Sequence, residues 1–131
     1  MNLLLRILFA GVLVAMLGVT SWASWHCPLF GVPRAVLGHP WFLATLCDAY
    51  AGFLTFYVWV CWKETTLPVR LLWFAAIMLL GNIAMAVFVL RELFDPANGT
   101  SLPELLARRR PPQLALPAAL TTVAAAVLTF A

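Results

Sequence analysis

An acidic side chain inside an apolar segment is the feature of this sequence that most directly suggests chemistry. Asp48 lies about seven residues inside the apolar run of residues 41–62. A carboxylate at that depth in lipid costs roughly 2.5–3.5 kcal/mol or more unless it is neutralised or paired. Asp48 is therefore the first candidate for a proton-binding or ligand-binding site, with a hydrogen bond between helices as the structural alternative.

Polar residues of three predicted helices share the depth of Asp48. Counted from the expected helix ends, they fall within about 10 Å of one membrane interface at 1.5 Å per residue. The predicted buried polar cluster comprises Asp48, Asn82, Thr20, Ser21, Tyr50 and Thr45. Such a cluster could also serve only to bind helices together, and a misplaced helix end would leave Asp48 among the lipid headgroups.

Catalytic and metal-binding patterns are absent from the sequence. It has no G-x-S-x-G, no H-E-x-x-H, no Gly-rich phosphate loop and no Cys/His ligand spacing. The acidic residues outside the apolar runs are expected in turns, where they balance nearby Arg and Lys; they are Glu64, Glu92, Asp95 and Glu104. We expect no metal and no cofactor, and the pattern leans against an enzyme.

The composition is that of a membrane protein. Hydrophobic residues make up 64% of the 131 residues and charged residues only 10%, against roughly 25% in a soluble domain. The net charge of +3 comes mostly from residues between apolar runs. Basic loops of this kind meet anionic headgroups, so membrane lipids are expected partners and nucleic acid is not.

The apolar runs predict an all-α membrane protein of one domain, residues 1–131. It is a bundle of three to four transmembrane helices, with spans at about residues 7–25, 41–62, 71–90 and, as the fourth, 114–131. The short turn at 63–68 makes spans two and three an antiparallel hairpin, and 91–113 forms an extramembrane loop. A cleaved signal peptide ending near residue 23 is an alternative for the first span.

The basic residues give a slight preference for orientation. With four crossings, three lie on the side of the N-terminus and five on the other side, which together account for all eight. The positive-inside rule then favours an outside N-terminus. The triplet Arg108, Arg109 and Arg110 is expected to contact the membrane surface.

Three segments resemble a known family. They are residues 41–57, the tripeptide Trp62-Lys63-Glu64 and residues 80–86. They are similar to a family of small bacterial integral membrane proteins, with plant relatives, known only as a domain of unknown function. The resemblance covers about the first 110 residues, and the Ala-rich end looks like an addition. It implies a multi-pass protein, expected in a bacterial inner or plasma membrane, and carries over no functional residues.

Three functions are consistent with these observations. The first is an accessory or structural component that assembles through small and polar helix faces, as a homo-oligomer or in a larger membrane complex. The second is a small oligomeric transporter or proton-coupled element using Asp48. The third is a membrane-embedded lipid-modifying enzyme, for which the sequence offers no evident nucleophile–base pair.

Overall fold

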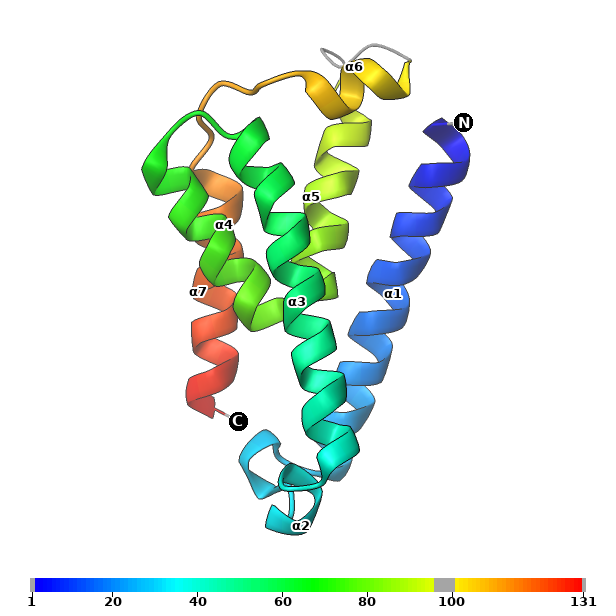
Figure 1. The fold of residues 1–131 in the computed structure, drawn as a ribbon, viewed down its shortest axis with the longest axis vertical. Coiled ribbons are helices and arrows are strands. Elements are labelled where there is room, and N and C mark those ends of the chain that lie inside the picture. The colour runs from blue at the N-terminus through cyan, green and yellow to red at the C-terminus, as the bar shows by residue number, and fades with distance from the viewer. Residues whose placement is uncertain (1, 96–100, 131) are drawn as a thin grey trace.

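All the regular elements in the described part of the chain are helices. The computed structural model describes residues 2–95 and 101–130 and contains no strand there. In chain order the elements are α1 (Asn2–His26), η1 (Leu29–Gly31), α2 (Arg34–Leu37), α3 (Pro40–Lys63), α4 (Leu67–Leu80), α5 (Asn82–Phe94), α6 (Leu102–Ala107) and α7 (Ala115–Phe130). Figure 1 shows α1 and α3 as the two long helices, joined by η1 and α2 at one end of the molecule.

Among the described residues, α1 and α3 are the helices that are both long and apolar enough to cross a membrane. α1 has 25 residues and a mean hydropathy of 2.3, and α3 has 24 residues and a mean hydropathy of 1.4. At 1.5 Å per residue each exceeds a hydrocarbon core of about 30 Å. Pro40 begins α3, where its missing N–H removes no helical hydrogen bond.

The predicted third span is wrong as a single helix, because the chain breaks at Gly81. α4 ends at Leu80 and α5 begins at Asn82. Gly81 has φ 54° and ψ −126°, a conformation that L side chains rarely adopt. A Cβ at this position would lie 2.7 Å from Cζ of Phe53. The two halves, of 14 and 13 residues, are each only about 20 Å long at 1.5 Å per residue.

α4 and α5 form a helical hairpin that starts and ends at the same end of α3. Two hydrogen bonds fix α4 antiparallel to α3, from Tyr57 Oη to Arg70 O (3.0 Å) and from Tyr50 Oη to Met78 O (3.4 Å). Gly81 then turns the chain against Phe53, near the middle of α3. α5 returns toward α6, as Figure 1 shows, and packs along α1.

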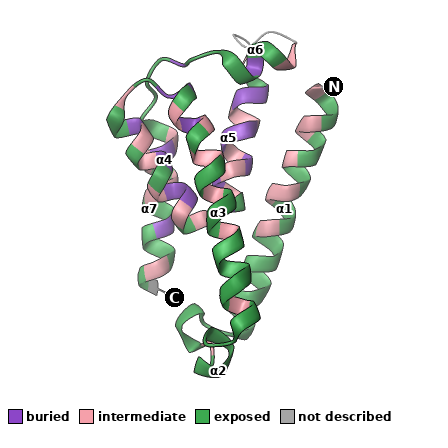
Figure 2. Ribbon diagram, viewed as in Figure 1, coloured by how far each residue is buried: buried purple, intermediate pink, exposed green. Residues whose placement is uncertain are grey.

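The core lies within this hairpin and the adjoining half of α3. Trp73 of α4 and Phe88 of α5 are fully buried, with ring centroids 4.9 Å apart in an edge-to-face pair. Phe56 and Trp59 of α3 pack on the same Phe88 ring at 5.8 and 5.3 Å. Figure 2 shows burial concentrated in α4 and α5, whereas α1 and the half of α3 nearer α2 are mostly exposed.

α7 packs against α4 on the side of the hairpin away from α1. It corresponds to the predicted fourth helix at 114–131, of which residue 131 lies outside the described residues. The predicted loop 91–113 contains the end of α5 and α6, and its residues 96–100 also lie outside them.

Replacing Thr121 by valine is expected to lower the free energy of unfolding by about 1 kcal/mol, the usual net contribution of one hydrogen bond. Its hydroxyl donates to Leu72 O of α4 at 3.1 Å as well as to Pro117 O of its own helix. Unfolding by SDS in mixed micelles, followed by tryptophan fluorescence, measures the change. Thr122→Val is the matched control, because Thr122 bonds only Ala118 O of its own helix. Equal losses in the two variants would contradict the role of Thr121.

Candidate functional site

The residues of the predicted polar cluster are exposed in this structure. Asp48, Asn82 and Ser21 lie on the surfaces of α3, α5 and α1, and no hydrogen bond or ion pair joins Asp48 to Asn82. Thr20 donates to Met16 O at 2.6 Å and Thr45 to Trp41 O at 2.8 Å, both within their own helices.

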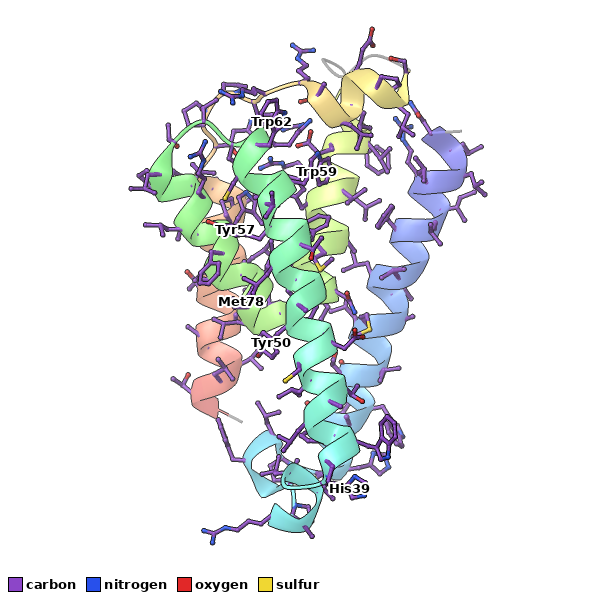
Figure 3. All side chains as sticks on the ribbon, viewed as in Figure 1. His39, Tyr50, Tyr57, Trp59, Trp62 and Met78 are labelled. Carbon is purple, nitrogen blue, oxygen red and sulfur yellow. The ribbon has the colours of Figure 1, made fainter. Side chains whose placement is uncertain are left out.

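Of this set, Tyr50 is the residue whose side chain hydrogen-bonds another helix, through its bond to Met78 O. Figure 3 labels both residues where α3 lies beside α4, well away from His39. The break at Gly81 also changes the depth of Asn82, which begins α5 at the level of Phe53. Asn82 therefore lies nearer the middle of α3 than a continuous third helix would place it.

Charged side chains gather instead at the other end of the molecule, where α3, α5 and the segment after α6 meet. They are Lys63, Glu64, Arg91, Glu92, Asp95 and Arg110. We call this set the charge network. Lys63, Glu64 and Glu92 are fully buried, and Arg91 and Arg110 nearly so.

Glu92 is the centre of the charge network. Its Oε2 lies 2.5 Å from Lys63 Nζ, and its Oε1 lies 3.2 Å from Arg91 Nη2 and 2.6 Å from Arg110 Nε. The last contact is an ion pair whose N–H direction does not meet hydrogen-bond geometry. Three cations thus surround one carboxylate away from water, where removing either sign of charge leaves the other uncompensated.

Glu64 links the two ends of the helical hairpin. Its carboxylate pairs with Arg91 at the end of α5, and its backbone carbonyl accepts a hydrogen bond from Arg70 Nε near the start of α4 at 2.9 Å. The Arg91 guanidinium also lies over the rings of Trp73 (5.1 Å) and Phe88 (4.9 Å). The hairpin is therefore held closed by charge and by cation–π contact.

Arg110 ties the segment after α6 to this arrangement. Its guanidinium Nη2 lies 2.5 Å from Asp95 Oδ2. Its backbone N–H donates to Lys63 O at 3.0 Å, and its backbone carbonyl accepts a hydrogen bond from Thr65 Oγ1 at 3.2 Å. Arg110 is thus turned inward, although the sequence pattern placed it at the membrane surface. Arg108 and Arg109 are exposed, and the Arg109 guanidinium lies over the Trp62 ring at 4.8 Å.

Helix ends explain why these charges meet. Lys63 ends α3 and Arg91-Glu92 lie in the last turn of α5, so the hairpin brings together two dipeptides that each hold one basic and one acidic residue. Sequence reasoning placed Glu64 and Glu92 in turns and so missed their burial. The available signal was a Lys-Glu pair and an Arg-Glu pair, each ending an apolar run.

Some buried hydrogen-bond donors and acceptors in and beside the charge network have no partner among the described residues. Four buried atoms around Arg91 have no hydrogen-bond partner among them: Glu64 Oε2, Trp73 Nε1 and Arg91 Nε and Nη1. Lys63, in contrast, has two polar partners, because Nζ pairs with Glu92 and also donates to Leu105 O of α6 at 2.6 Å. An amine so paired is not a free nucleophile, and the arrangement holds segments together rather than presenting a reactive group.

α1 is attached to the same end of the molecule. Arg6 donates to Leu93 O through Nε at 3.2 Å and Nη2 at 2.6 Å, and its guanidinium lies 4.6 Å from the centroid of the Phe94 ring. The N-terminal turn of α1 is therefore fixed to the last turn of α5.

Comparison with known proteins assigns a family and no activity. No curated protein and no solved structure matches the chain. One family model does, over residues 3–107, and its description is a protein of unknown function (DUF1475). The match covers α1 to α6 and ends before Arg110 and α7. Because it spans most of the sequence, the chain belongs to the DUF1475 family of proteins of unknown function.

Proposed function

We propose that this protein is a multi-pass integral membrane protein with an accessory or structural role, which assembles with another membrane helix through one face of α3. The observation that carries the proposal is an exposed carboxylate on an otherwise apolar helix.

The exposed surface of the long helices supports membrane insertion. No residue of α1 is buried, and its exposed side chains include Leu4, Val14 and Trp25 at 69, 70 and 88%. Tryptophans lie near both ends of α3, at Trp41 and Trp62, about 32 Å apart at 1.5 Å per residue. That spacing fits a hydrocarbon core of about 30 Å with an aromatic side chain at each interface.

In this arrangement the hairpin of α4 and α5 enters the bilayer and returns to the same side. A helix break at membrane depth is tolerated where protein covers its polar backbone groups. Gly81 is buried and lies against Phe53, which meets that requirement. α1, α3 and α7 pack around the hairpin, and the charge network closes it at the interface.

The face of α3 around Asp48 supports the proposed assembly. Thr45, Asp48, Gly52 and Thr55 follow one stripe of the helix by steps of three and four residues, and all four are exposed. Apart from the adjacent residues and the backbone of α3, no atom lies within 4 Å of the position that a Cβ would occupy at Gly52. An exposed carboxylate in hydrocarbon costs roughly 2.5–3.5 kcal/mol, so covering Asp48 with a second helix lowers the free energy.

Replacing Asp48 by alanine is expected to weaken association about tenfold or more, because alanine leaves no polar side chain exposed to lipid in the separated state and forms no hydrogen bond to the partner helix. Asp48→Asn should retain most of the association, since an amide still forms hydrogen bonds between helices. Crosslinking yield in native membranes, followed by native electrophoresis, reports whether the partner is a second copy or another protein.

Thr20→Ala is the control for that experiment, because Thr20 bonds only carbonyls of its own helix. Identical crosslinking of the wild type and Asp48→Ala would contradict the assembly proposal. Release of the protein from membranes by alkaline carbonate would contradict membrane insertion itself.

A small transporter using Asp48 is the second candidate, and the break at Gly81 favours it. Discontinuous helices near the bilayer midplane form the binding sites of many transporters. Proton flux in vesicles that Asp48→Asn abolishes, with assembly intact, would favour this candidate over the accessory role.

A further inference from the structure

The structure collects the basic residues at one end of the molecule. Seven of the eight Lys and Arg residues lie at the end that holds the charge network and the start of α1. They are Arg6, Lys63, Arg70, Arg91, Arg108, Arg109 and Arg110. The remaining one, Arg34, begins α2 at the opposite end, which Figure 1 shows below α3.

The helical hairpin causes this distribution. Four successive crossings would put Arg91 and the residues after it across the membrane from Lys63, and the basic residues would divide three to five. Because α5 returns to the start of α4, Arg91 instead pairs with Glu64 and Arg110 bonds Lys63 O. The basic residues then divide seven to one between the two sides of the membrane. The side with more of them is now the side of the start of α1, whereas four crossings would make it the opposite side.

We infer that this end faces the cytoplasm and that Arg108 and Arg109 contact the headgroups of anionic phospholipids there. The inference rests on the proposed membrane insertion. Basic residues in short segments next to membrane helices stay on the cytoplasmic side, where anionic lipids attract exposed Lys and Arg. The placement of α1 to α3 follows from it: the start of α1 and the end of α3 are cytoplasmic, and α2 lies on the other side of the membrane.

Arg108 and Arg109 are the residues available for lipid. Lys63, Arg91 and Arg110 are buried and paired with carboxylates, whereas Arg108 and Arg109 are exposed. Arg109 lies over Trp62, an exposed aromatic residue at the end of α3 of the kind found at membrane interfaces. This exposed pair is complementary in charge to phosphate groups.

Labelling of single cysteines tests the orientation. The native Cys27, Cys47 and Cys61 are replaced by serine, and Val36→Cys or Leu106→Cys is introduced at exposed positions of the two ends. In bacterial spheroplasts, a membrane-impermeant maleimide should label position 36 directly and position 106 only after permeabilisation. The reverse pattern in carbonate-resistant protein overturns this inference and leaves membrane insertion intact. Release by carbonate overturns both.

The lipid contact has its own measurement. Phosphatidylglycerol added to the protein in phosphatidylcholine micelles should raise the melting temperature of the wild type and of Arg34→Ala. The same addition should have at least a several-fold smaller effect on the double variant Arg108→Ala/Arg109→Ala, and 0.5 M salt should weaken the wild-type response. An unchanged response of the double variant overturns the headgroup contact.

Discussion

Replacing Glu92 by glutamine is expected to destabilise the fold by about 3–5 kcal/mol, the usual cost of removing one partner from a buried ion pair. Glu92 is 0% exposed and lies within 3.2 Å of side-chain nitrogens of Lys63, Arg91 and Arg110. An amide keeps the shape of the side chain but leaves those cations with less negative charge. SDS unfolding in mixed micelles, followed by tryptophan fluorescence, gives the free energy.

Two further variants make the Glu92 experiment specific. Glu104→Gln removes the same charge from an exposed position of α6 and should change stability by no more than about 0.5 kcal/mol. Lys63→Met combined with Glu92→Gln removes one charge of each sign and should recover at least about 1 kcal/mol relative to Glu92→Gln alone. Purely additive losses in the double variant would show that the two residues are not coupled.

The second large effect is expected at Gly81. Gly81→Ala should cost roughly 2–6 kcal/mol, as the sum of a strained backbone conformation and an overpacked contact. The backbone contribution follows from φ 54°, and the contact is the 2.7 Å approach of the new Cβ to Phe53 Cζ. The same unfolding titration measures the loss.

The controls for Gly81 separate the two causes. Gly18→Ala places a methyl group in open space on α1 and should be neutral or stabilising by up to about 1 kcal/mol. Phe53→Leu in the Gly81→Ala background relieves the contact but not the backbone strain, so stability should recover in part. If Gly81→Ala behaved like Gly18→Ala, α4 and α5 would not be turned at this residue.

Together these variants test how the ends of the hairpin are linked to its turn. Gly81 sets the direction in which α5 returns, and the charge network joins that return to α3 and to the segment after α6. Arg6 links α1 to the same place through Leu93 O. Membrane orientation, in our proposal, depends on this closure, since it determines the side on which Arg91 and the residues after it lie.

The positions of the long helices follow from the sequence alone. The apolar runs at 7–25 and 41–62 lie within α1 and α3, and the run at 114–131 corresponds to α7. Family membership also follows from the sequence, because the segments around residues 41–57 and 80–86 lie inside the matched range. Hydrophobicity and local composition decide these features, and neither requires contacts between distant residues.

Tertiary structure alone decided the reversal at Gly81 and the meeting of the charges. No charged residue interrupts 71–90, so hydropathy predicts one continuous helix there. The turn instead depends on the positive φ of Gly81 and on the packing of this residue against Phe53. Lys63 and Glu92 lie far apart in the sequence. They form an ion pair because the hairpin brings the end of α5 back to the end of α3. The sequence contained the charges, but their burial is a property of how three helix ends pack.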